Sequence, residues 1–185
     1  QQVTVTAGEW YHYADYGLGS YLTCHYTVSF GNVKATAYCV QPSKPGPGDG
    51  TYTITRLKDG KTLAKVCYYG TKASGGEGFF AEKYPDFSTG KRFIITHLAA
   101  AYANGSSDAF SGANATGKAL AMELYDYCVK QPDIPDVEMS FSNGNVKAYI
   151  EGNRQRTEEV TFRADAQQTI TMKLPSGKVY RTSLF

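Results

Sequence analysis

The alternation of apolar and polar residues predicts short β-strands in the first part of the chain. The runs that fit a period of two are residues 3–6, 21–30, 33–40, 51–56 and 61–69. Gly31 and Asn32 separate the second run from the third, and a two-residue loop that begins with glycine is typical of a β-hairpin. Residues 9–19 have no regular period and are predicted to be irregular, and residues 72–78 are predicted to form a glycine-rich loop.

The pattern changes to a helical period in the middle of the chain. Residues 91–103 place apolar side chains and His97 on one stripe, and residues 115–131 do the same before Pro132. Strands are predicted again at 137–142, 146–151, 159–164, 169–174 and 178–184. This order predicts an α+β fold with an antiparallel β-sandwich or barrel-like body and an inserted α-helical subdomain. We expect one domain over residues 1–185, with β parts at 1–75 and 133–185 and a helical insert at about 76–132.

Composition narrows the possible partners. The 185 residues carry a formal net charge of +2 and no basic cluster, which argues against a nucleic-acid partner. No run of about 18 apolar residues is present, so we expect no membrane insertion of this sequence. The spacing of the cysteines fits no zinc motif, and no phosphate-binding glycine motif ends in Lys-Ser or Lys-Thr. We therefore expect neither a metal nor a cofactor.

The predicted hairpin fixes where the first cysteines lie. If Phe30 faces Val33, opposed residue numbers sum to 63, so Cys24 lies across from Cys39. Parity places Cys39 on the apolar face, which we take to face the core, and His25 on the other face. The prolines that begin at Pro42 end the strand just after Cys39. A semi-buried thiol is therefore predicted at the end of the sheet, beside a stiff loop.

The motifs around Cys39 and His97 resemble a known family. Tyr38-Cys39-Val40, Tyr68-Tyr69-Gly70 and the segment 96–102 (Thr-His-Leu-Ala-Ala-Ala-Tyr) resemble the thioester domains of Gram-positive surface adhesins and pilus-tip proteins. The resemblance implies that a strand cysteine and a helix glutamine form an internal thioester, which amines on a host surface attack. It also implies an extracellular, cell-surface domain of a larger protein, monomeric by itself, with Tyr38, Gln41, Tyr69 and Thr96 around the ligand site.

This sequence departs from that pattern where the glutamine is expected, because it has His97. Imidazole has no carboxamide, so Cys39 and residue 97 cannot form the thioester. Three interpretations of Cys39 remain open. In the first, Cys39 is a reactive thiolate paired with His97, which Asp49 or Asp86 would orient. In the second, Cys39 forms a disulfide with Cys24. In the third, Cys39 is an unreactive thiol packed in the core. Cys67 and Cys128 are predicted to pack in the core or to pair with each other.

Three functions follow from these interpretations. The first is an adhesin domain that binds a protein on a host or neighbouring cell, or an amine-bearing ligand, without a covalent bond. The second is a Cys39–His97 cysteine hydrolase or acyltransferase. The third is a structural pilin or stalk module with a Cys24–Cys39 disulfide.

Overall fold

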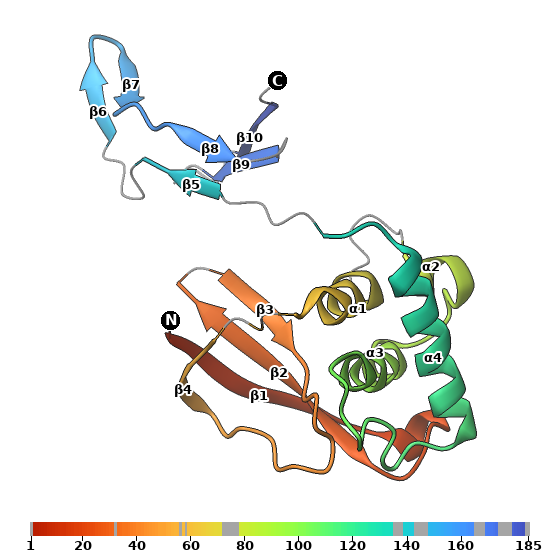
Figure 1. The fold of residues 1–185 in the computed structure, drawn as a ribbon. Coiled ribbons are helices and arrows are strands. Elements are labelled where there is room, and N and C mark those ends of the chain that lie inside the picture. The colour runs from red at the N-terminus through yellow and green to blue at the C-terminus, as the bar shows by residue number, and fades with distance from the viewer. Residues whose placement is uncertain are drawn as a thin grey trace. The chain divides into compact units, whose positions relative to one another are not determined.

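The chain divides into two compact units, Gln1–Ile134 and Pro135–Phe185. The structure is a computed structural model, and it describes residues 2–31, 33–55, 57, 59–71, 78–134, 139–142, 148–164, 169–173 and 179–183. Among these residues, the first unit contains strands β1–β4 and helices α1–α4, and the second contains strands β5–β10 (Figure 1). The single domain predicted over residues 1–185, with β parts at 1–75 and 133–185, stays a prediction. Of the glycine-rich loop predicted at 72–78, only Gly78 lies inside the described residues.

An antiparallel sheet of four strands forms one part of the first unit. Its spatial order is β3-β2-β1-β4, and the strands are β1 (Gln2–His12), β2 (Leu22–Phe30), β3 (Val33–Ala37) and β4 (Gly50–Thr53). Phe30 pairs with Val33 and Tyr26 with Ala37, so the predicted hairpin register is confirmed. The pairing ends at Ala37, and Tyr38 and Cys39 follow the strand rather than belonging to it. The α+β class is confirmed, and the sheet does not close into a barrel over the described strands.

The first strand is longer than the sequence pattern indicated. It continues to His12 through a register shift between Ala7 and Trp10, and the 3-10 helix η1 (Tyr13–Tyr16) follows at once. Residues 9–12 were predicted to be irregular because the shift breaks their alternation. Gly17 then ends η1 in the left-handed conformation, with φ of 68°, which glycine adopts without a steric penalty.

Four helices form the other part of this unit. They are α1 (Lys61–Thr71), α2 (Phe79–Lys83), α3 (Thr89–Ala103) and α4 (Ala115–Lys130). The two long predicted helices are confirmed as α3 and α4, but the strand predicted at residues 61–69 is wrong, because this segment is α1. Its apolar side chains recur at Leu63, Val66 and Cys67, which is helical spacing. The β-branched and aromatic residues in the segment favoured a strand by propensity, and packing of Val66 in the core overrides that preference.

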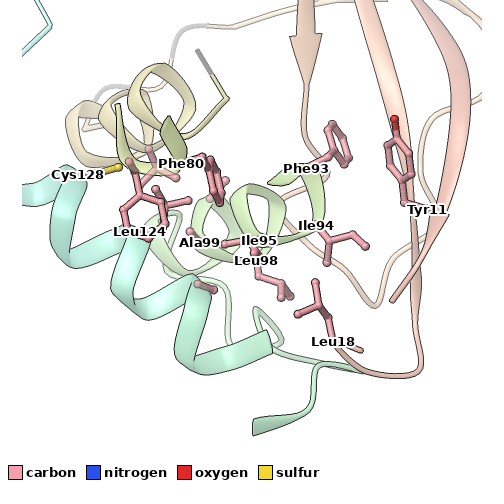
Figure 2. Close-up of a cluster of buried hydrophobic side chains, with 14 of the residues drawn as sticks. Tyr11, Leu18, Phe80, Phe93, Ile94, Ile95, Leu98, Ala99, Leu124 and Cys128 are labelled. Carbon is pink, nitrogen blue, oxygen red and sulfur yellow. The ribbon is translucent and has the colours of Figure 1, made fainter. Parts of the chain in front are cut away.

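The main hydrophobic core lies around α3. Figure 2 shows Ile94, Ile95 and Leu98 on this helix, with Leu124 projecting toward it from α4, Cys128 farther along α4, and Leu18 approaching from the chain after η1. These residues are buried, as are Ala99 and Ala100 on the same helix. Because α3 is apolar nearly all round, it is enclosed on all sides.

Phe93 joins this core to the sheet. Its ring centroid lies 5.4 Å from that of Tyr11, 4.9 Å from that of His25 and 4.9 Å from that of Tyr38. Tyr11 and His25 lie on the sheet face opposite the one that carries Cys24 and Tyr26, and Tyr38 follows the end of β3. The main core around α3 therefore meets the face of the sheet opposite Cys24.

The face that carries Cys24 instead holds a small cluster of its own. Val3, Val5, Cys24 and Tyr26 are buried in it. Parity identified the apolar face correctly, but both faces of this sheet bury apolar side chains. The alternation of residues therefore did not show which face the helices cover.

The second unit consists of three two-stranded antiparallel pairs among the described residues. Strand β5 (Met139–Phe141) pairs with β8 (Phe162–Ala164), β6 (Ala148–Glu151) with β7 (Arg154–Thr157), and β9 (Thr169–Lys173) with β10 (Val179–Ser183). Strand β7 was not predicted, whereas the other five lie within predicted strands. In the described part of the chain, no helix combines the length and the apolar character needed to cross a bilayer.

Candidate functional site

Cys39 lies two residues beyond the end of β3, at the start of the loop that leads to β4. Its side chain is half-buried, and Sγ donates a hydrogen bond of 3.4 Å to the carbonyl oxygen of Gln41. Cys24 donates instead to the carbonyl of Gly8, and both cysteines are free thiols, so the Cys24–Cys39 disulfide is not formed. Because β3 ends before residue 39, the two cysteines are not paired across the ladder as the extended register implied.

His97 lies on α3, and its side chain is only 1% exposed. A hydrogen bond joins its ring to the backbone of Cys39. Nδ1 is buried and has no well-formed hydrogen bond among the described residues. The bond favours the protonated ring, so its acceptor is the carbonyl oxygen of Cys39. The structure thus brings residues 39 and 97 together, as the family resemblance implied.

Burial controls the protonation of this imidazole. Desolvation lowers the pKa of His97 from its ordinary value of 6.5 to about 4, although the hydrogen bond to Cys39 acts in the opposite direction. The ring is therefore neutral at neutral pH. A neutral ring supplies no positive charge to stabilise a thiolate, so the pair lacks the electrostatic feature of an activated cysteine.

The lowered pKa predicts that the first unit loses stability in mild acid. The unfolded chain binds a proton at His97 below its ordinary pKa of 6.5, and the folded chain does so only near 4. The stabilisation is thus complete above pH 6.5 and is lost as the pH falls toward 4; it is on the order of 3 kcal/mol. Urea unfolding between pH 8 and pH 4 checks this, with His97→Leu as the control. An equal loss of stability in both proteins would contradict the assignment to His97.

Tyr13 completes the buried surroundings of Cys39. Its side chain is fully buried, its ring lies edge-on to that of His97 with centroids 6.3 Å apart, and its hydroxyl has no partner among the described residues. Burial raises the pKa of Tyr13, and so does the nearby charge that Cys39 carries when it is ionised. Tyr13 was not singled out from the sequence, because it follows the irregular pattern of residues 9–19.

The other predicted ligand residues have different surroundings. Tyr38 is half-buried and stacks on Phe93 at an interplanar angle of 27°, so it packs between sheet and helix. Gln41 is exposed on the loop after Cys39. Gln41 is therefore the more accessible of the two to a molecule in solution.

Thr96 and Tyr69 serve helix packing. Thr96 is buried, donates to the carbonyl of Arg92 at 2.8 Å and lies against Gly70 of α1, where a Cβ would approach Thr96 Cγ2 to 2.7 Å. Tyr69 donates to the carbonyl of Pro132 at 3.2 Å. Among the described residues, no hydrogen bond joins Tyr69 to Cys39. The motif around Tyr68-Tyr69-Gly70 thus marks the close packing of α1 on α3.

Neither carboxylate proposed to orient His97 does so. Asp49 accepts a hydrogen bond of 2.7 Å from the backbone N–H of Ala7, and Asp86 is exposed. Because Nδ1 of His97 has no partner in the described part of the chain, the third group of a catalytic triad is not in place there. The geometry therefore favours a packed histidine over a general base.

Two loops meet beside Cys39. Asp108 Oδ2 accepts a hydrogen bond of 2.9 Å from the backbone N–H of Ser43 and another from Ser43 Oγ, and Ser106 Oγ donates to the carbonyl of Val40. These contacts connect the loop after Cys39 to the loop after α3. Sequence reasoning missed Ser106 and Asp108, because nothing in the local pattern shows that these two loops are neighbours.

The comparisons with known proteins agree with this arrangement. A family profile described as thioester domain matches residues 2–135, which is well over half of the chain. The chain belongs to the thioester domain family. A second profile, for the β-sandwich domain associated with thioester domains, matches residues 140–182. The boundary between the two matched profiles lies close to the boundary between the two units.

A solved structure extends the likeness to the fold. This thioester domain chain is similar to a structure titled "The Bacillus anthracis TIE protein", with a TM-score of 0.50 and 13% sequence identity. The match covers 99% of this chain and 36% of that one, so the chain spans about a third of that protein. Among the curated proteins, no sequence matches the chain.

Proposed function

We propose that this chain is the ligand-binding part of a larger Gram-positive surface adhesin, and that it binds its surface ligand without an internal thioester. The observation that carries the proposal is that His97, and not a glutamine, contacts Cys39 from α3. The family match supports the adhesin-like assignment. The part-length match to a longer protein supports a domain within a larger chain.

The chemistry of position 97 determines which bond can form. A thioester forms when the cysteine sulfur attacks a carboxamide carbon, the C–N bond breaks and ammonia leaves. Imidazole offers no such carbon and no leaving group. The protein would therefore hold its ligand by hydrogen bonds and packing alone, and washing or denaturation would release the ligand.

The exposed loop after Cys39 is the proposed contact surface. Gln41 and residues 43–49 are exposed, and Pro42, Pro45 and Pro47 limit the conformations of the loop. A loop with few accessible conformations loses less entropy when it binds. The partner we propose is a protein on a host or neighbouring cell, or another amine-bearing ligand that meets Gln41.

The other two functions have less support. A Cys39–His97 hydrolase or acyltransferase would need a charged or well-oriented imidazole, whereas His97 is neutral and Nδ1 has no partner among the described residues. A stalk module with a Cys24–Cys39 disulfide would need two cysteines that are free thiols here.

Two experiments test the proposed function. The intact mass of the unreduced protein should equal the sequence mass, and incubation with biotinylated cadaverine, a primary amine, should leave no label after denaturation. Beads coated with the full chain should adhere to a layer of tissue cells and come off in detergent with no covalent adduct.

Beads coated with heat-unfolded chain are the control for adhesion. A deficit of about 17 Da, the mass of ammonia, or a covalent amine adduct would contradict the non-covalent mechanism. Adhesion no greater than that of the control beads would contradict the adhesin assignment.

A further inference from the structure

The two loops that meet beside Cys39 are joined by side chains rather than by a sheet. Asp108 holds Ser43 through both the backbone N–H and Oγ, and Ser106 holds the carbonyl of Val40, the residue next to Cys39. We call these contacts the clasp, defined by Asp108–Ser43 and Ser106–Val40. The loop after Cys39 also closes on itself, because Lys44 N–H donates to the carbonyl of Gln41 at 2.9 Å.

We propose that Asp108 and Ser106 are positioning residues that keep Cys39 against the ring of His97 and limit access of reagents to its thiol. Cys39 has no strand pairing of its own, because β3 ends at Ala37. The segment after it is therefore held by the clasp, by its internal turn and by the contact of its backbone with His97. This inference shares the Cys39 site with the proposed function but does not depend on which ligand is bound.

The strength of the clasp comes from a charged acceptor. A carboxylate that accepts two hydrogen bonds from one residue fixes both the position and the direction of the backbone at that residue. These bonds also lower the pKa of Asp108, so its side chain is ionised at neutral pH. Without the carboxylate, the backbone N–H of Ser43 turns to water, and Pro42 limits how the chain between Ser43 and Cys39 can adjust.

Release of the clasp has two separate consequences. The thiol of Cys39 becomes more accessible, and the ring of His97, which contacts the Cys39 backbone, becomes more accessible to water. Hydration of the ring removes part of the desolvation that lowers its pKa. The thiol of Cys128, which is buried on α4, should not respond.

The test is the rate at which iodoacetamide alkylates Cys39 in the full chain, followed by peptide mass mapping. Ser43→Ala should raise this rate about fivefold, the factor that loss of one typical net hydrogen bond gives, and Asp108→Ala, which removes two, should raise it at least as much. The double variant should react no faster than the faster single variant, because both changes remove the same contact. Ser43→Thr, which keeps the hydroxyl, should react at the wild-type rate.

Controls separate positioning from general loosening. Asp126→Ala removes an exposed carboxylate on α4 and should leave the rate unchanged. NMR titration should show a higher pKa for His97 in Asp108→Ala than in the wild type, which simple loss of global stability would not produce.

An unchanged Cys39 rate in both Asp108→Ala and Ser43→Ala would overturn the inference. So would an equal rise at Cys128. If Asp108→Ala does not fold, the rate measured in Ser43→Ala still tests the inference. Neither rate depends on ligand binding, so failure here is distinguishable from failure of the adhesin assignment.

Discussion

His97→Gln should convert this chain into one with an internal thioester. Glutamine places a carboxamide on α3 where the imidazole now contacts Cys39, in an environment that excludes water. Attack by Cys39 Sγ on the carboxamide carbon forms the C–S bond, breaks the C–N bond and releases ammonia with the thiol proton. The intact mass should fall by about 17 Da, the mass of ammonia, and biotinylated cadaverine should now attach covalently.

The control for this variant is His97→Gln combined with Cys39→Ser. It keeps the new carboxamide and removes the sulfur, so its mass should match its sequence and it should take up no amine. If His97→Gln also keeps its full mass while remaining folded, position 97 is not the place of the acyl donor, and the explanation given for the absent thioester fails.

Phe93→Ala should unfold most of the first unit under conditions that the wild type tolerates. Phe93 is buried and contacts the rings of Tyr11, His25 and Tyr38, which belong to the sheet and to the segment that carries Cys39. Truncation leaves a cavity between sheet and helix, and the expected loss is about 3–5 kcal/mol of unfolding free energy. This is a large fraction of the ~5–15 kcal/mol that stabilises a typical domain.

Urea unfolding measures that loss, and Phe30→Ala is the matched control. Phe30 is on the same sheet but is 50% exposed, so its truncation should change the free energy of unfolding by only about 0.5 kcal/mol. If both variants lose the same small amount, the sheet and α3 are not joined through Phe93. Cys39 and His97 would then lack the packing that holds them together.

Local sequence signals predicted the elements that carry the site. The Gly31-Asn32 loop fixed the register of β2 and β3, and the apolar stripes located α3 and α4. The family motifs led to Cys39 and His97, which the structure brings into contact. Each of these signals is either local in the sequence or based on a family resemblance. They therefore predict the elements without any knowledge of the tertiary packing.

Long-range packing decided what the sequence did not show. The β-branched and aromatic residues of α1 favour a strand by propensity, although its apolar residues have helical spacing. Both sheet faces bury apolar side chains, so alternation did not identify the face that meets Phe93. The contact of Asp108 with Ser43 spans 65 residues, and Tyr13 meets His97 only in the folded chain.

The ring of His97 gives the most direct test that this side chain is packed against the Cys39 backbone. Proton–nitrogen NMR of the imidazole should show a neutral ring at pH 7, with its N–H proton protected from solvent exchange, and a pKa near 4. The ring of His12, which is exposed, provides the internal reference for exchange. A His97 ring that exchanges as fast as that of His12 and takes up its proton near 6.5 would contradict the account, because the imidazole would then be in water and not against Cys39.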